Sequence, residues 1–220
     1  MARAVALFSG GIDSTTLVWK LKAEGWELIL LSFNTYRRNP REIAAADNIA
    51  RLAHPLEYLV QDLGILREIY DFPSDQRLAI DMNLKTPPTI LIPYKNIVYY
   101  SLAAHLASQL GATVLAGGHT LEDQSTLPDA SRKYLNNVES LLNESLSYPR
   151  IRLITPLIGM SKPQIVRLGV ELGAPLQLTW SCWATGEVHC GTCVGCLNRI
   201  KAFREAGVAD GTEYLAWYSV

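Results

Sequence analysis

A glycine-containing segment near the start of the chain combines groups that can bind a phosphate. Residues 9–16 read SGGIDSTT and lie between an apolar run and a stretch with helical spacing. Glycine tolerates positive φ and close approach, so consecutive N–H groups can point at one anion, and a helix start adds free N–H groups. Ser9, Ser14 and Thr15 add hydroxyl groups. Asp13 has a carboxylate that can hold the Mg²⁺ of a nucleotide. The Gly-Lys-Ser/Thr ending of a Walker A loop is missing. We therefore expect a different nucleotide-phosphate loop; the alternative is a turn capped by Asp13 that binds no ligand.

The cysteines of the chain lie close together near its end, at Cys182, Cys190, Cys193 and Cys196. Four thiolates at this C-x7-C-x2-C-x2-C spacing can form a closed tetrahedral zinc site, with Gly191 and Gly195 allowing the turns. An iron–sulfur cluster is the main alternative, because C-x2-C-x2-C also occurs in ferredoxins. Disulfides are disfavoured in a reducing cytosol. We expect structural zinc that folds the tail over the nucleotide site, with His189 at the surface or beside the ligands.

Short apolar segments alternate with segments of helical spacing. We expect strands at residues 4–8, 28–33, 56–60, 113–116 and 151–157, and helices from residue 13, at 41–53, at 96–110 and from 161 to about 173. This alternation is typical of parallel strands joined by right-handed crossovers. The sequence therefore predicts an α/β fold with a doubly wound parallel sheet. Residues 63–92 and 118–132 show little regular pattern, and we expect them to be loops near the ligand site, at the carboxyl ends of the strands.

Length and composition restrict the class of protein. The 220 residues suit one large domain, and we expect a nucleotide-binding domain over 1–178 and a small zinc-binding subdomain with all four cysteines over 179–220. With a net charge of −1, the chain lacks the overall positive charge expected of a protein that binds long nucleic acids. No apolar run reaches the ~18 residues of a membrane span, and the start does not resemble a signal peptide. We expect a soluble cytoplasmic enzyme without a membrane or nucleic-acid partner, and apolar helices and five tryptophans favour a homodimer.

The motifs together resemble a known family. Residues 9–14 resemble the Ser-Gly-Gly-x-Asp-Ser loop of the ATP pyrophosphatase (PP-loop) group, and loop and cysteine cluster together resemble the 7-cyano-7-deazaguanine synthases (QueC family). Residues 92–96 (IPYKN) resemble the family's Pro-Gly-Arg-Asn segment, and residues 123–129 (DQSTLPD) its Asp-x-Ser-Gly-Tyr-Pro-Asp segment. Matches continue at residues 155–162 and in TWSC at 179–182. The resemblance covers most of the chain and fails mainly between residues 54 and 90.

The resemblance implies an adenine nucleotide alpha-hydrolase-like fold and a ligase that forms C–N bonds in queuosine or archaeosine precursor synthesis. The carboxylate of 7-carboxy-7-deazaguanine would attack ATP to give an acyl adenylate and pyrophosphate. Ammonia would then give an amide, and a second ATP would activate this amide for dehydration to the nitrile.

The resemblance also implies roles for single residues. Asp13, Lys95 and Lys162 would be catalytic, because a carboxylate that attacks a phosphate needs its charge shielded by cations. ATP with Mg²⁺ would lie on Phe8, Ser9, Gly10, Gly11, Ile12, Asp13, Ser14, Thr15, Thr16, Leu17 and Val18. The substrate would lie on Asn96, Asp123, Ser125 and Asp129. Asp123 and Asp129 would bind the guanine-like edge of the substrate or a second Mg²⁺. The alternative for these aspartates is that they only cap turns, and the alternative for Lys95 and Lys162 is that they are solvated.

Two segments depart from the family pattern. Residues 35–39 read TYRRN where the family has Tyr-Gly-Gln-x-His, and residues 126–131 read TLPDAS where it has Gly-Tyr-Pro-Asp-Cys-Arg. Arg37 and Arg38 are either solvated or bind an acidic group of the substrate. Three alternatives therefore remain: adenylation of another carboxylate, tRNA thiolation, and a zinc-stabilised nucleotide sensor without turnover.

Overall fold

The computed structural model describes residues 2–35, 38–66, 92, 94–146, 148, 150–184 and 186–215. In this part of the chain a five-stranded parallel sheet has the order β3-β2-β1-β4-β5. The strands are β1 (Arg3–Leu7), β2 (Glu27–Asn34), β3 (Glu57–Asp62), β4 (Val114–Ala116) and β5 (Arg152–Ile154). β1 lies at the centre of the sheet: β2 and β3 follow on one side of it, and β4 and β5 are added later on the other side. The sheet is therefore doubly wound, as predicted. Ligands of such sheets bind beside this reversal, at the carboxyl ends of the strands.

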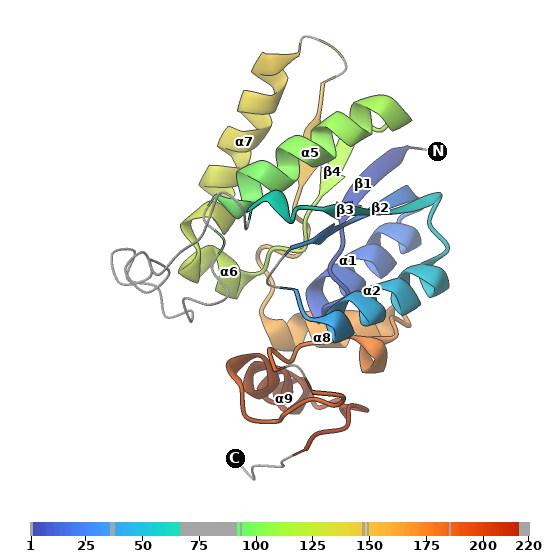
Figure 1. Cartoon of the computed structure of the whole chain (residues 1–220), viewed down its shortest axis with the longest axis vertical. Helices are drawn as coiled ribbons and strands as arrows, with labels where there is room; N and C mark the ends of the chain where they lie inside the picture. Colours follow the sequence, from blue (N-terminus) through green and yellow to red (C-terminus); the bar gives the residue numbers. More distant parts are fainter. Residues whose placement is uncertain are drawn as a thin grey trace.

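Helices cover both faces of the sheet (Figure 1). They are α1 (Ile12–Ala23), α2 (Pro40–Ala53), α5 (Lys95–Leu110), α6 (Leu121–Thr126), α7 (Arg132–Ser145), α8 (Lys162–Glu171) and α9 (Val194–Ala206). Side chains alternate along a strand, so Ala4 and Ala6 of β1 pack in one core with α1, α2, α8 and α9. Val5 packs in a second core with α5 and α7.

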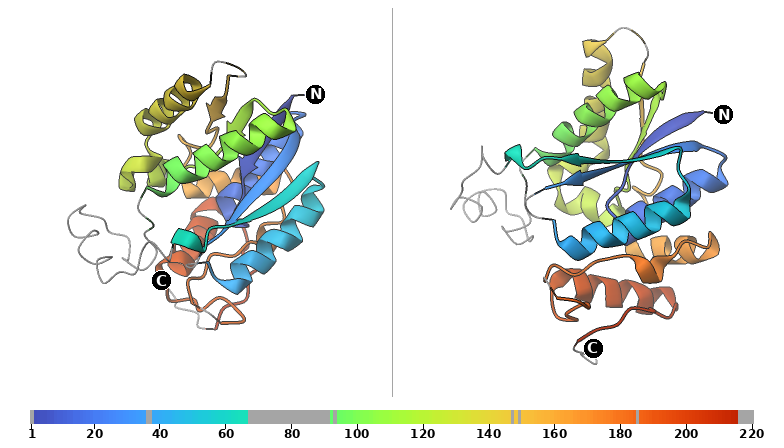
Figure 2. Two further views of the ribbon diagram at one scale, coloured as in Figure 1. Left: turned by 45° about the horizontal axis from the view of Figure 1, so that its top comes forward. Right: turned by 45° about the vertical axis from the view of Figure 1, so that its right-hand side comes forward.

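The C-terminal segment forms an outer layer. Figure 2 shows α9 beyond α8, on the face of the sheet that α1 and α2 cover. Ala202, Phe203 and Ala206 of α9 belong to the same core as the inner helices. Cys182, Cys196 and Tyr214 form a small separate cluster. The cysteine-bearing segment thus packs on the layer of α1, α2 and α8 through the apolar side of α9.

The structure corrects part of the expected element list. Residues 118–132, expected to be irregular, contain α6 and a 3₁₀ turn at Pro128–Ala130. A capping box begins α6, in which Thr120 Oγ1 accepts the Asp123 N–H at 3.2 Å and Asp123 Oδ2 accepts the Thr120 N–H at 3.0 Å. The strand β5 is shorter than the expected 151–157 segment. Most of the expected loop at 63–92 lies outside the described residues. No helix within the described ranges is long and apolar enough to cross a membrane.

Candidate functional site

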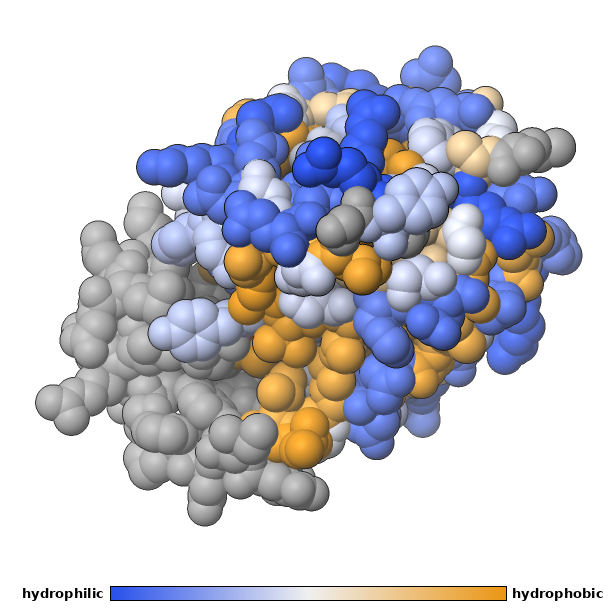
Figure 3. All heavy atoms as spheres, turned by 90° about the horizontal axis from the view of Figure 1, so that it is seen from above, coloured by the Kyte–Doolittle hydropathy of each residue, from blue (hydrophilic) through white to orange (hydrophobic). Residues whose placement is uncertain are grey.

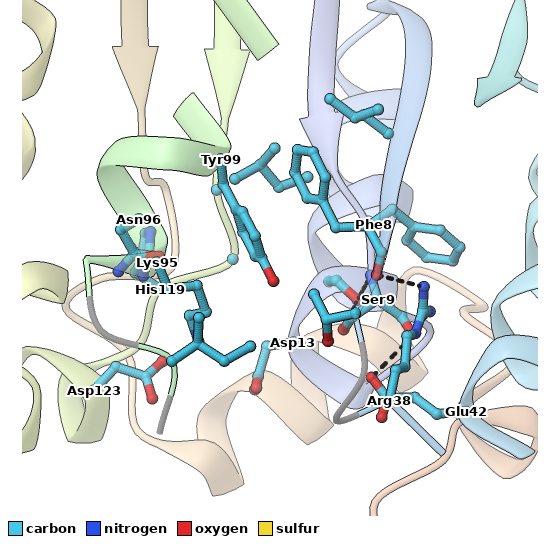
Figure 4. A pocket seen from close by; sticks show the side chains of 18 of the residues that line it. Phe8, Ser9, Asp13, Arg38, Glu42, Lys95, Asn96, Tyr99, His119 and Asp123 are labelled. Carbon is cyan, nitrogen blue, oxygen red and sulfur yellow. Dashed lines mark hydrogen bonds and ion pairs between the residues drawn. The ribbon is translucent and has the colours of Figure 1, made fainter. Parts of the chain in front are cut away.

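A cavity of about 470 Å³ opens at the carboxyl ends of β1, β2 and β4. Figure 4 shows Ser9, Arg38 and Glu42 on one side and Lys95, Asn96, His119 and Asp123 on the other, with Asp13 between them. Phe33 and Tyr99 add an apolar wall, with their rings stacked at 4.1 Å between centroids. Cationic, anionic and aromatic groups therefore face one space, as a site for a charged heteroaromatic ligand requires.

The segment after β1 is held as a tight loop. Gly10 has φ of +81°, and a Cβ there would lie 2.6 Å from the backbone N of Ala46 in α2. Inside the loop, Ser14 Oγ accepts the Ser9 N–H at 3.2 Å and lies 3.2 Å from the carbonyl O of Gly11, to which it donates. The Gly10 carbonyl accepts the N–H of Trp180 at 3.1 Å, which ties the loop to the cysteine-bearing segment. Both the loop conformation and its distance from α2 thus depend on the absence of a side chain at Gly10.

Apart from Gly10, which lines neither cavity, the residues expected to bind ATP divide into three groups. Phe8, Ser9, Asp13 and Ser14 line the main cavity. Gly11, Ile12 and again Asp13 line an adjoining cavity of about 270 Å³. Thr15, Thr16, Leu17 and Val18 are buried behind the loop, the last two within the core. The loop itself therefore faces the open space, and the first turns of α1 support it from behind.

Asp13 forms an ion pair with Lys162, the first residue of α8. Burial raises the pKa of Asp13, and the nearby Lys162 charge offsets only part of this effect. Burial opposes the charge of Lys162, but the carboxylates of Asp13, Asp123 and Glu122 outweigh it and raise the pKa of the lysine. Three carboxylates thus surround one ammonium group, and the local excess of negative charge suits a further cation.

Two carboxylate oxygens of this group have no hydrogen-bond partner among the described residues. Glu122 accepts the Lys162 backbone N–H through Oε1 at 2.9 Å, which brings α6 against the start of α8. Its Oε2 and the Oδ1 of Asp13 are both buried without a hydrogen bond to the described residues. A buried unpaired carboxylate oxygen is costly unless a cation or a ligand donor reaches it.

The expected substrate residues do not all face the cavity. Lys95, Asn96 and Asp123 line it. Asp129 lies behind Asn96, whose side-chain amide donates to the Asp129 carbonyl at 3.0 Å. Ser125 is exposed on α6 and donates to the Glu122 carbonyl, and it is not among the residues that line the cavity. Asp123 thus shows the local bonding of a helix cap, whereas Asp129 joins the 3₁₀ turn to the start of α5.

Arg38 has a structural role in the site that sequence reasoning did not predict. Its side chain is only 5% exposed and pairs with Glu42 of α2 at 3.4 Å. It also donates to the carbonyl oxygens of Ser9 at 2.7 Å and Phe33 at 3.2 Å. Arg38 therefore connects the ends of β1 and β2 to α2. Of the two alternatives that the sequence left open for it, the solvated side chain is wrong, and binding of an acidic substrate group stays a prediction, since Arg38 lines the cavity. Arg37 lies outside the described residues.

His119 is a residue of the site that sequence reasoning missed. It lies just after β4, lines the cavity and forms a 2.8 Å hydrogen bond through Nε2 with the hydroxyl of Tyr100 in α5. Burial lowers the pKa of His119, and Lys95 lowers it further, while Asp123 and Asp129 act in the opposite direction. A single histidine without a neighbouring motif gives no local signal, and its pairing with Tyr100 depends on the fold.

The thiol groups of Cys182, Cys190, Cys193 and Cys196 meet at one point, with all four Sγ atoms within 4.8 Å of one another. The Cys190–Cys196 and Cys182–Cys193 sulfur distances are 3.8 and 3.9 Å. A tetrahedron with Zn–S bonds of about 2.3 Å has edges of about 3.8 Å. Backbone N–H groups point at the sulfurs, including those of Ala184 at 3.3 Å and Cys196 at 3.5 Å. The four residues fit a closed zinc site.

Arg199 fixes the cluster to the rest of the fold. Its fully buried guanidinium pairs with Asp210 at 2.9 Å and donates to the carbonyl oxygens of Leu176 at 2.9 Å and Thr179 at 3.1 Å. His189 is also buried: its Nε2 accepts the Ser181 N–H at 3.1 Å. Burial lowers the pKa of His189 to about 4. Of the two places expected for His189, the one beside the ligands is therefore confirmed.

Comparisons with known proteins agree with this geometry. The sequence model of the family described as "Queuosine biosynthesis protein QueC" matches residues 3–207. The 7-cyano-7-deazaguanine synthase of Methanothrix thermoacetophila is 35% identical over 224 residues, covering 97% of this chain and 99% of the relative. That of Acetivibrio thermocellus is 33% identical over 227 residues, covering 98% and 99%. The structure of NMN synthetase from Francisella tularensis has a TM-score of 0.55 at 14% identity, covering 94% of this chain and 77% of that chain, and shows the same fold.

Proposed function

The chain belongs to the QueC family, and we propose that it converts 7-carboxy-7-deazaguanine, ammonia and ATP into 7-cyano-7-deazaguanine, the nitrile of queuosine precursor synthesis. The observation that carries this proposal is the Asp13–Lys162 pair at the loop after β1, which faces a cavity lined by a second lysine and by aromatic rings. A carboxylate and a triphosphate are both anions, and a reaction between them needs this concentration of donors and cations.

The groups of the loop suit attack on the α-phosphate of ATP. We assign the pyrophosphate to the loop N–H groups and the hydroxyls of Ser9 and Ser14, next to the start of α1. Lys162 lies beside the loop and would neutralise the leaving pyrophosphate. Lys95 begins α5 on the opposite side of the cavity and would shield the attacking carboxylate. The carboxylate oxygen forms a bond to phosphorus as the bond to pyrophosphate breaks.

The same groups act in both ATP-dependent steps of the proposed reaction. Ammonia attacks the acyl adenylate, a C–N bond forms, AMP leaves and a proton passes to water. The amide oxygen then attacks a second ATP and releases pyrophosphate, and loss of AMP and of both protons of the amide nitrogen leaves the nitrile. Phe33 and Tyr99 would hold the planar base through both steps, since their stacked rings form one wall of the cavity.

Asp13 and Glu122 fit a Mg²⁺ ion that accompanies ATP. Each has one buried carboxylate oxygen without a partner among the described residues, and oxygen atoms are the ligands that Mg²⁺ prefers. When bound, Mg²⁺ neutralises phosphate charge at this edge of the loop. Asp13 would hold the ion and keep Lys162 in place.

We assign the four-cysteine site to structural zinc. Four thiolates leave no open coordination position, so the metal supplies folding free energy rather than chemistry. Cys182 and Trp183 line both cavities, and the Trp183 N–H lies 3.5 Å from the Cys193 sulfur to which it donates. We propose a boundary between the nucleotide-binding domain and this subdomain near residues 178 and 179, as the sequence predicts.

A homodimer is the proposed assembly. Figure 3 shows hydrophobic side chains gathered on the face seen from the side of α5 and α7. On α5, Ile97, Val98, Leu102 and Leu106 are only partly buried. Sedimentation of the zinc-loaded protein tests this assembly, which requires a mass near twice 24.4 kDa.

The function is tested by turnover of the zinc-loaded protein with ATP, Mg²⁺, ammonium and 7-carboxy-7-deazaguanine. Mass spectrometry should find the nitrile, with two pyrophosphates released per nitrile. Omission of ammonium should stop the reaction after the first pyrophosphate. Pyrophosphate release only with a different carboxylate would mean that the nucleotide site is kept and the acceptor has changed.

A further inference from the structure

His119 is held in one orientation by a partner outside the cavity. Its Nε2 lies 2.8 Å from the hydroxyl of Tyr100, a fully buried residue of α5. The hydroxyl occupies the space where a side chain of Gly117 would lie, so a Cβ at Gly117 would collide with it. The glycine just after β4 thus allows the Tyr100–His119 pair to form, and the pair fixes the ring plane of the histidine.

The pair also decides which nitrogen of His119 carries the proton. Burial raises the pKa of Tyr100, so its hydroxyl keeps its proton. Within the described part of the chain this hydroxyl has no acceptor other than His119 Nε2. If Nε2–H were the donor, the buried tyrosine O–H would remain unpaired, which is costly. The tyrosine therefore donates, Nε2 accepts, and the imidazole proton lies on Nδ1.

The Nδ1–H group has no hydrogen-bond partner among the described residues, and His119 lines the cavity together with Lys95 and Asp123. The charged groups that act on His119 are Lys95 of α5, Asp123 of α6 and Asp129 of the 3₁₀ turn. Burial lowers the pKa of His119, and these groups together do not bring it back to its ordinary value. The ring is therefore neutral at neutral pH. A neutral, oriented N–H beside a cationic side chain is suited to hydrogen-bond an oxygen that gains negative charge.

We propose that His119 Nδ1–H donates a hydrogen bond to the carboxyl-derived oxygen of the substrate and stabilises the negative charge on that oxygen when ammonia attacks. This role rests on the synthase reaction proposed above. The nitrogen lone pair forms the C–N bond, and the C=O pair moves onto the oxygen that His119 holds. When this pair returns, the bond from carbon to the AMP oxygen breaks, AMP leaves with its electrons, and the proton of the nitrogen passes to water. His119 remains neutral throughout and acts as a donor, not as a base.

Three substitutions distinguish a donor at Nδ1 from a base and from a donor at Nε2. The amide N–H of asparagine can take the place of Nδ1–H, whereas that of glutamine lies nearer the position of Nε2. His119→Ala should lower kcat for nitrile formation by about 100-fold, the usual effect of losing one oxyanion donor. His119→Asn should recover at least tenfold of this loss, and His119→Gln should not. Zinc content and circular dichroism identify any variant that has not folded.

An asparagine variant as inactive as the alanine variant, or an alanine variant with wild-type kcat, would overturn the proposal. The tautomer can be measured without turnover, by ¹⁵N NMR of the histidine rings in the zinc-loaded protein, with His119→Gln used for assignment. The proton should lie on Nδ1, and Tyr100→Phe should remove this preference. A proton on Nε2 in the wild type would contradict the inference even if nitrile forms. Absence of nitrile in the wild type, with the proton on Nδ1, would instead contradict the proposed function.

Discussion

The ammonium group of Lys162 contacts the carboxylate of Asp13, although 149 positions separate the two residues in the chain. This ion pair joins the loop after β1 to the start of α8, on one side of the cavity. It brings a cation to the place where the loop offers its N–H groups. We propose that pyrophosphate is released at that place.

Asp13→Asn should lower ATP-dependent pyrophosphate release by about 100-fold or more and leave the fold intact. The amide keeps the shape of the side chain but loses the charge that pairs with Lys162 and that we propose to hold Mg²⁺. A coupled pyrophosphate assay measures the effect. Glu24→Gln is the matched control: Glu24 follows the same helix and pairs with Lys20 at the surface. Equal activity of the two variants would remove Asp13 from the mechanism.

Gly10→Ala and Gly25→Ala separate backbone strain from crowding. Both glycines have left-handed φ, +81° and +83°, but a Cβ at Gly25 meets no atom within 4 Å, whereas one at Gly10 meets the backbone of Ala46. Each alanine should cost roughly 1–2 kcal/mol for its φ, and Gly10→Ala about 1–3 kcal/mol more for overpacking. Urea denaturation and calorimetric titration with ATP measure these effects. Equal free energies of unfolding would show that the loop does not rest against α2.

Arg199→Met should destabilise the zinc-loaded protein by about 3–5 kcal/mol, because it leaves the largely buried carboxylate of Asp210 without its cationic partner. The control on the same helix is Lys201→Met: Lys201 is exposed and its pair with Glu205 measures 3.8 Å, so the expected change is within about 0.5 kcal/mol. Both free energies come from chemical denaturation. If Arg199→Met changed stability no more than Lys201→Met, the buried pair would not anchor the C-terminal segment.

Metal analysis should find about one zinc per chain. Cys193→Ser should lose both the zinc and stability, because binding of a structural zinc contributes to the free energy of folding. Thr192→Ala is the matched control: it removes one hydroxyl contact to the Cys190 sulfur and keeps all four thiolates. A brown protein that absorbs near 400 nm would indicate an iron–sulfur cluster instead. A stable, active and metal-free Cys193→Ser protein would contradict the structural role.

Features encoded by neighbouring residues could be predicted from the sequence. The loop at residues 9–16 and the cysteine spacing are local patterns, and the alternation of strands and helices predicted the sheet. Helix α7 was missed although it has a usable signal: Ser131 caps it and Leu135 and Val138 are buried at helical spacing. The capping box of Thr120 and Asp123 was a similar signal for α6.

Features that need distant segments to meet could not be predicted in this way. The place of Glu122 beside Lys162 depends on how α6 and α8 pack. The pairing of His119 with Tyr100 depends on the crossover from α5 to β4, and the burial of Arg38 depends on α2. In each case the sequence contains the residue, but its role arises from a contact made only in the folded chain.

The most direct test follows the carboxyl oxygens of the substrate. With 7-carboxy-7-deazaguanine labelled with ¹⁸O in both carboxyl oxygens, attack on the α-phosphate predicts that each nitrile is accompanied by two AMP molecules that carry one ¹⁸O each, and that pyrophosphate stays unlabelled. Mass spectrometry of the nucleotides and of pyrophosphate gives this distribution directly. Label in pyrophosphate or phosphate, or AMP without label, would contradict the assignment of this loop to adenylation.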